Sequence, residues 1–205
     1  MTTGAGAGAA TLARRTTVAQ DLVEAARSLM WETGAPVFTV SQVVAAAGTS
    51  LKSFYRCFGS KDELLVALFA DDAKRGADAL AAVVAADEDP VLRVRAAVEG
   101  LFGFLAVDGP LPYAAALVRE HLRLSETRPR ELQAVLQPFV DVFRTELAAA
   151  GHRGLLAVGD PAVTARTLLH LVVSHLHALL FHQIDEPPAR VAGDVWAFCA
   201  AALRP

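Results

Sequence analysis

Apolar residues recur at three- and four-residue spacing along most of this chain, and that period is typical of amphipathic helices. Ser, Thr or Asp residues that favour helix N-termini precede these stripes, and Gly or Pro residues follow them. No stretch gives a convincing strand, and Ala and Leu, which favour helix, dominate the composition. The pattern predicts an all-α fold of about nine helices, over residues 17–33, 39–47, 51–58, 60–84, 89–107, 113–124, 130–150, 160–183 and 189–203.

Residues 39–61 are the most informative stretch, because two short predicted helices meet there at a tight turn around Gly48. This arrangement is typical of a helix-turn-helix, whose second helix is free to enter the major groove of DNA. Apolar residues between 40 and 47 let the first short helix pack on the N-terminal helix, while Phe54 and Phe58 anchor the second helix inward. The outward or flanking positions of the second helix hold Lys52, Ser53, Tyr55 and Arg56.

The same stretch resembles the DNA-binding domain of the TetR family of bacterial repressors. The turn Ala-Gly-Thr-Ser at 47–50 matches that family's pattern, and so does Phe-Tyr-Arg-Cys-Phe at 54–58. Ser60-Lys61 and the Asp-Glu-Leu-Leu helix start at 62–65 extend the match. The likeness covers roughly residues 16–70, about a third of the chain.

The resemblance implies a three-helix DNA-binding domain followed by a helical-bundle domain that binds a ligand and dimerises through its last two helices. Residues 1–13 are rich in Gly, Ala and Thr, and we expect them to be disordered. The expected division is therefore a tail over 1–13, a DNA-binding domain over 14–70, and a ligand-binding and dimerisation domain over 71–205.

Carried over to this sequence, the resemblance assigns phosphate contacts to Thr39 and Lys61 and a backbone or base contact to Tyr55. Lysine and arginine in a major groove most often contact guanine. The candidate DNA-binding residues are Thr39, Ser41, Ser50, Lys52, Ser53, Tyr55, Arg56 and Lys61. Lys52 stands where the family often has Gly, and Leu51 where it often has Lys, so the operator sequence cannot be predicted.

Charge is distributed unevenly along the chain. Its net charge is −3, but the first 61 residues hold six Lys or Arg against three Asp or Glu, so this part carries +3 and the remainder −6. This distribution indicates that only the N-terminal part meets phosphate. Cys57 and Cys199 match no metal-ligand spacing and indicate a reduced, cytoplasmic protein. The most apolar run, 168–181, is interrupted by polar residues and too short to span a bilayer.

The predicted helix over 160–183 is apolar almost all round, so it must be covered on both sides. A second subunit is the natural cover on one side, which predicts a homodimer on a palindromic operator. The other side is expected to face a core or a cavity for a small apolar effector. Candidate lining residues are Phe102, Leu105, Tyr113, Leu117, His121, Phe139, Phe143, His170, Val173 and His177.

These patterns predict a ligand-responsive transcriptional regulator, most simply a repressor that a small apolar ligand releases from DNA. Nucleotide-binding and nucleophile motifs are missing from the sequence, so neither an enzyme nor a cofactor is expected. Two alternatives remain: a helical ligand-binding protein without DNA binding, and a metal-responsive regulator that uses the histidines between 170 and 182. The latter lacks an accompanying ligand motif, and no metal site is expected.

Overall fold

Ten helices make up the parts of the chain that the structure, a computed structural model, describes, namely residues 4–106 and 111–205. Within those ranges there is no strand, so the all-α prediction is confirmed with ten helices in place of about nine. In chain order they are α1 (Gly4–Thr33), α2 (Val40–Ala46), α3 (Leu51–Cys57), α4 (Lys61–Val84), α5 (Pro90–Ala106), α6 (Leu111–Ser125), α7 (Pro129–Val135), α8 (Gln137–His152), α9 (Pro161–Leu180) and α10 (Pro188–Ala202).

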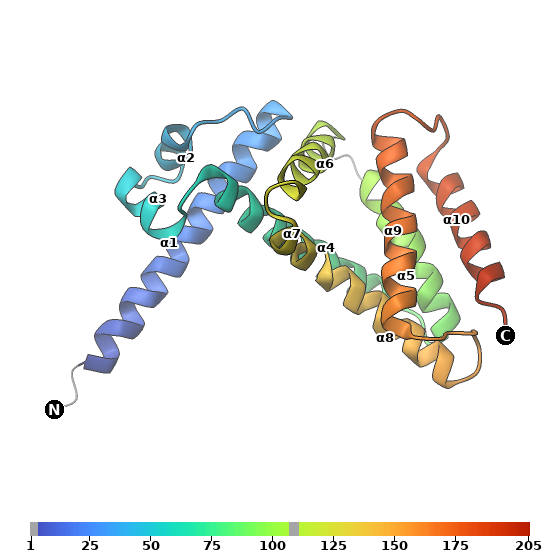
Figure 1. The fold of residues 1–205 in the computed structure, drawn as a ribbon. Coiled ribbons are helices and arrows are strands. Elements are labelled where there is room, and N and C mark those ends of the chain that lie inside the picture. Colours follow the sequence, from blue (N-terminus) through green and yellow to red (C-terminus); the bar gives the residue numbers. More distant parts are fainter. Residues whose placement is uncertain (1–3, 107–110) are drawn as a thin grey trace.

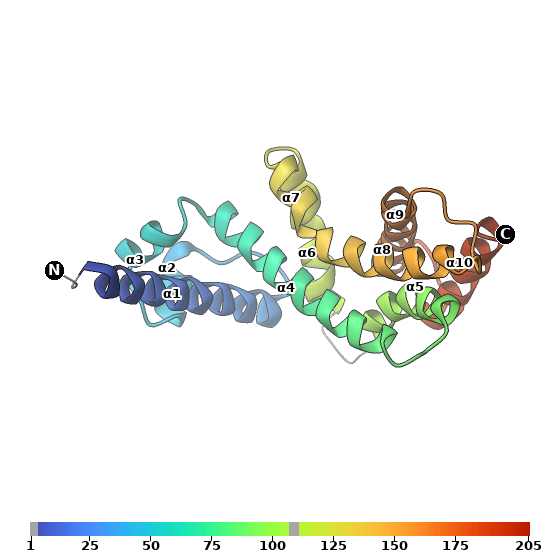
Figure 2. The ribbon, with the colours of Figure 1, turned by 90° about the horizontal axis from the view of Figure 1, so that it is seen from below.

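The molecule is elongated, and one long helix connects its two ends (Figures 1 and 2). Helices α1, α2 and α3 lie at one end, and α4 runs from them to the opposite end, where it meets α5 and α8. Helices α9 and α10 lie side by side at that far end, while α6 and α7 occupy the middle. Any movement of α4 therefore involves both ends of the molecule.

Helix α1 begins earlier than the pattern predicted. It starts at Gly4, whereas the apolar stripe indicated a helix from residue 17 after a disordered tail over 1–13. Composition explains the extension, because alanine has the highest helix propensity, and the segment that continues the helix is rich in alanine and contains no proline. Residues 1–3 lie outside the described residues.

One predicted helix is divided in two. The pattern indicated a continuous helix over 130–150, but α7 ends at Val135 and α8 begins at Gln137, with Leu136 between them. Pro138 in the first turn of α8 explains the break, because proline has no N–H to donate to the carbonyl of Ala134 one turn earlier. The break makes α7 a separate element, which packs against α4.

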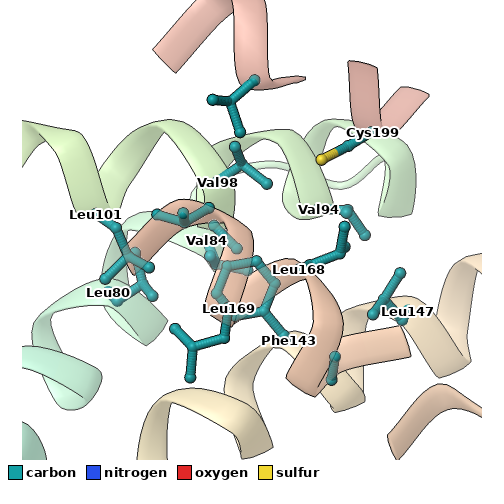
Figure 3. Packing of buried hydrophobic residues seen from close by; sticks show 14 of the residues in the cluster. Leu80, Val84, Val94, Val98, Leu101, Phe143, Leu147, Leu168, Leu169 and Cys199 are labelled. Atoms are coloured by element: carbon teal, nitrogen blue, oxygen red, sulfur yellow. The ribbon is translucent and has the colours of Figure 1, made fainter. Parts of the chain in front are cut away.

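Two clusters of buried apolar residues stabilise the fold. The C-terminal core joins α4, α5, α8, α9 and α10, and Figure 3 shows Phe143 packed among Leu80, Leu169 and their neighbours. The N-terminal core joins α1, α2, α3 and the first half of α4. Helices α6 and α7 also contribute buried residues to the N-terminal core, although they lie beyond the domain boundary predicted near residue 70.

Helix α9 is the one helix in the described ranges that is long and apolar enough to cross a membrane by length and composition. The core helix of a soluble protein passes the same test when its neighbours cover it. Only 22% of the apolar window of α9 is buried within the single chain, although α8 and α10 pack against it. Much of this apolar helix is therefore left without cover by its own chain.

Candidate nucleic-acid interface

Helices α2 and α3 owe their short lengths to capping and turn residues. The Thr39 hydroxyl accepts a hydrogen bond from the Gln42 N–H at 3.2 Å, and the Gln42 side chain accepts one from the Thr39 N–H at 2.7 Å. This reciprocal capping box begins α2. Gly48 ends the turn region with φ of +59°, a left-handed conformation that favours glycine, and Ser50 caps α3 two residues later. The predicted helix-turn-helix geometry is thus present.

The inner face of α3 is fixed by aromatic packing. Phe54 is fully buried and Phe58 nearly so, and their ring centroids lie 5.9 Å apart. Both belong to the N-terminal core, together with Val43 and Val44 of α2. These contacts determine the rotation of α3 about its axis, and therefore which of its residues face outward.

The outer face of α3 carries the chemistry expected for DNA contact. Lys52 and Arg56 are exposed, and Tyr55 is 60% exposed, with the edge of its ring against Phe54. Leu51 is also exposed at 47%. α3 thus exposes two cations, a phenol and one apolar side chain, a composition suited to phosphates, base edges and thymine methyl groups.

The serines in this region have different surroundings. Ser41 on α2 is exposed. The Ser50 hydroxyl accepts a hydrogen bond from the Ser53 N–H at 3.2 Å and donates one to the Ser53 hydroxyl at 3.1 Å. Ser50 therefore begins α3 as its N-cap, and the half-buried Ser53 lies in the first turn of the same helix.

Thr39 and Lys61, the two residues expected to contact phosphate, are engaged within the protein. Both donors of Thr39 reach the Gln42 side-chain oxygen. The Lys61 ammonium donates to the carbonyl oxygens of Pro36 at 2.5 Å and Phe38 at 2.8 Å, and lies 4.4 Å from the centroid of the Phe38 ring. Burial lowers the pKa of Lys61. Their phosphate contacts remain predictions.

The candidate effector residues are divided between the two cores and the half-buried parts of α5, α6 and α9. Phe102 and Phe143 are buried in the C-terminal core, whereas Tyr113 is buried in the N-terminal core. Phe139 packs against both cores, and His170 is exposed. The remaining candidates are half-buried residues on α5, α6 and α9, namely Leu105, Leu117, His121, Val173 and His177.

His121 on α6 and His177 on α9 are half-buried histidines whose surroundings alter their pKa. Burial lowers the pKa of His121, and burial together with the charge of His121 lowers the pKa of His177. The Nε2 atom of His121 is buried without a hydrogen-bond partner, and its ring lies 6.4 Å from that of Phe69. Among the described residues, no group of three or more His, Cys, Asp or Glu side chains gathers as a metal site would require.

A groove of about 440 Å³ is lined by α9, α10 and the segment that joins them, and it includes none of the ten candidate effector residues. Phe198, one of the residues that line it, is 66% exposed, although its sequence neighbour Cys199 is fully buried. The residues that line the groove are Leu171, His175, Ile184, Glu186, Val191, Asp194, Val195 and Phe198.

Sequence reasoning missed a cluster of charges where α1 meets α4. Arg27, on the buried side of α1, pairs with Asp72 at 2.8 Å and also with Asp71 and Glu24. Arg75 extends the cluster through an ion pair with Asp71. The available signal was a cation within an otherwise apolar stripe, since Arg27 directly follows the buried residues 25 and 26.

A helix-turn-helix that presents Lys52, Tyr55 and Arg56 from a rigidly packed second helix defines a DNA-binding transcriptional regulator. The family model for bacterial regulatory proteins of the tetR family matches residues 22–68, which span the end of α1 to the start of α4. Residues 22–68 therefore match the DNA-binding domain of tetR-family regulators, and this match supports a regulator of that family.

Several solved structures share the fold over nearly the whole chain. FadR of Bacillus subtilis, in complex with stearoyl-CoA, has a TM-score of 0.70 at 14% identity and covers 89% of this chain and 97% of its own. RolR in complex with resorcinol has a TM-score of 0.70 at 17% identity, covering 91% and 89%. A TetR transcription regulator of Haloarcula marismortui has a TM-score of 0.69 at 17% identity, and the match covers 93% of this chain and 100% of that regulator. No curated protein sequence matches the chain.

Proposed function

We propose that the protein is a homodimeric, cytoplasmic repressor that binds a palindromic operator and leaves it when a small, largely apolar effector binds the C-terminal domain. The observation that carries the proposal is the outer face of α3, where Lys52, Tyr55 and Arg56 are exposed while Phe54 beneath them is fully buried. Ser41, Ser53 and the N-cap Ser50 complete the proposed contact surface. We assign the protein no catalytic role.

The DNA-binding proposal is tested by selecting duplexes from a random pool with the purified full-length protein, alongside the DNA upstream of its own coding sequence. We expect enrichment of a two-fold symmetric site. Arg56→Gln is expected to weaken binding by about 1–3 kcal/mol at one base position per half-site. Lys74→Gln, which alters an exposed lysine of α4 paired with Asp78, is the matched control. Failure to enrich any sequence would favour the alternative, a ligand-binding protein without DNA binding.

The homodimer is supported by the uncovered apolar surface of α9 and α10. The exposed Phe198 lines the groove between α9 and α10, and a two-fold axis places the same surface of a second copy opposite it. Phe198→Asp introduces a charge into this surface and is expected to yield monomers in sedimentation velocity. Leu122→Asp, at a 55% exposed position of α6, is expected to leave the dimer intact. A dimer that persists in Phe198→Asp would contradict this interface.

The apolar effector is supported by the composition of the C-terminal core, whose buried residues are all apolar apart from Glu146. Half-buried Leu105, Phe139 and Val173 are more accessible to a ligand than the fully packed Phe143. The relatives with bound acyl-coenzyme A and resorcinol suggest acyl thioesters and phenols as probes. A compound that raises the melting temperature and releases the selected operator is the expected result. An operator complex that no bound compound weakens would contradict the release mechanism.

A further inference from the structure

Helix α6 belongs structurally to both ends of the molecule. Its residues Tyr113, Ala116 and Leu124 are buried in the N-terminal core with Leu22 and Phe69. Helix α6 also contacts α9 of the C-terminal domain, and it lies between the two ends in Figures 1 and 2. A conformational change in the C-terminal domain that displaces α6 therefore also shifts the contacts of α6 with the DNA-binding domain.

The polar link at this junction centres on one carboxylate. The Tyr113 hydroxyl donates a hydrogen bond to Asp72 Oδ2 at 2.5 Å, and Arg27 Nε donates to Asp72 Oδ1 at 2.8 Å. Three helices, α1, α4 and α6, thus meet at Asp72. The Arg27 side chain is 12% exposed and that of Asp72 is 21% exposed, so water screens these contacts only in part. Burial, and then the Asp72 charge, raise the pKa of Tyr113, which keeps its hydroxyl protonated as the donor.

Close packing accompanies the polar link. Trp31 and Tyr113 lie with ring centroids 5.4 Å apart. A Cβ atom added to Gly34 would lie 2.7 Å from Cβ of Pro112, so the end of α1 and the first turn of α6 already touch. Farther along α6, Arg123 bonds Asp62 at 2.7 Å, but both side chains are more exposed. The first turn of α6 is the tightly held part.

From this geometry we infer that Tyr113 is a positioning residue that holds the DNA-binding domain against α6 through Asp72 and Arg27. The inference rests on the proposed function and identifies the residues by which it is regulated. Docked α6 fixes the orientation of α1 and α4, and in a dimer this orientation determines the separation of the two recognition helices. Undocked α6 releases that constraint, so an effector that favours the undocked state changes the preferred spacing of half-sites.

The test compares wild type with Tyr113→Phe, which keeps the ring and removes only the hydroxyl. Operator affinity is measured on the selected duplex and on duplexes whose half-sites are one base pair closer or farther apart. We expect Tyr113→Phe to reduce the preference for the best spacing at least threefold, while its affinity at that spacing stays within about twofold of wild type. Asp72→Asn is expected to have a similar effect, and Arg144→Gln on α8, where Arg144 pairs with Asp141, is expected to have none.

A loss of packing alone would lower affinity equally at every spacing, and an unchanged spacing profile in Tyr113→Phe and Asp72→Asn would overturn the inference. Amide hydrogen exchange of the DNA-free protein provides an arm that does not depend on operator binding. In Tyr113→Phe and Asp72→Asn we expect exchange at least tenfold faster than in wild type in the first turns of α6 and the last turns of α1, with the exchange of α5 and α8 unchanged. If wild type binds no DNA, the proposed function fails, and unchanged exchange in the variants would separately reject the docking role.

Discussion

Replacing Lys61 by methionine separates two roles for this residue. The family resemblance makes Lys61 a phosphate contact at the start of α4, whereas the structure directs its ammonium to the carbonyl oxygens of Pro36 and Phe38. In the second role Lys61 holds the α1–α2 loop against α4 and so places Thr39, the N-cap of α2. Methionine keeps the length and apolar surface of the stem but has no donor and no charge.

The expected loss of stability follows from the contacts removed. A hydrogen bond from a charged donor contributes about 1.5–3 kcal/mol in buried surroundings. Lys61 is only half-buried, so solvent screening reduces that contribution, and the contact with the Phe38 ring adds about 0.5–1 kcal/mol. A total of roughly 2 kcal/mol is expected, which lowers the melting temperature of a protein this size by about 4–8 °C.

The decisive assay is operator affinity as a function of salt concentration. Each phosphate contact contributes about 0.9 to the slope of log affinity against log salt. If Lys61 holds the loop, Lys61→Met lowers both affinity and melting temperature but leaves the slope unchanged. Lys52→Met, at an exposed position of α3, is the comparison and is expected to lower the slope with little change in stability. A slope reduced by about 0.9 in Lys61→Met, with an unchanged melting temperature, would refute the loop-holding role and favour the phosphate contact.

Further predictions concern the turn, the histidines and the core. Gly34→Ala and Gly48→Ala both place alanine at positive φ, but only at Gly34 does the added Cβ meet a neighbouring atom. Chemical denaturation should therefore show a loss of stability of about 1 kcal/mol in Gly48→Ala and of at least 1 kcal/mol more in Gly34→Ala. Equal losses would contradict the close approach of α6 to α1. Burial lowers the pKa of His121 and His177 below 6.5, so the unfolded chain binds more protons than the folded chain as the pH falls. The stability that the neutral imidazoles contribute should therefore be fully present above pH 6.5 and decline at lower pH. The double variant His121→Gln, His177→Gln should show a smaller change of melting temperature between pH 7 and 5. Phe54→Ala should cost about 3–5 kcal/mol and abolish operator binding, as measured by denaturation and mobility shift, because α3 then loses its anchor.

The helix-turn-helix could be predicted from sequence because local chemistry determines it. The capping residue Thr39, the turn residue Gly48 and the spacing of Phe54 and Phe58 each act within a few residues, and all four behave in the structure as expected. The direction in which Lys61 points could not be predicted in the same way. Its partners are carbonyl oxygens more than twenty residues away, which have no signature in the side-chain sequence.

The C-terminal part is harder to predict because its helices are apolar on more than one side. Tyr113 was expected beside Phe143, yet the two are buried in different cores, since α6 packs on the N-terminal unit instead. Period alone indicates which residues of α6 are buried but not which neighbour buries them. The apolar composition of α9 did indicate that its own chain leaves part of it uncovered, and that expectation agrees with the low burial of this helix within the single chain.

The contacts around Asp72 differ from those around Phe54 in a way that suits regulation. When Tyr113 leaves, Asp72 loses one hydrogen bond but keeps its ion pair with Arg27, so no buried charge is left without a partner. Withdrawing Phe54 would instead expose a fully buried ring and open a cavity in the N-terminal core. Breaking the Tyr113–Asp72 hydrogen bond alone therefore costs on the order of 1–3 kcal/mol. That is the size of coupling by which ligands commonly shift a second binding site, and it leaves the recognition helix itself folded.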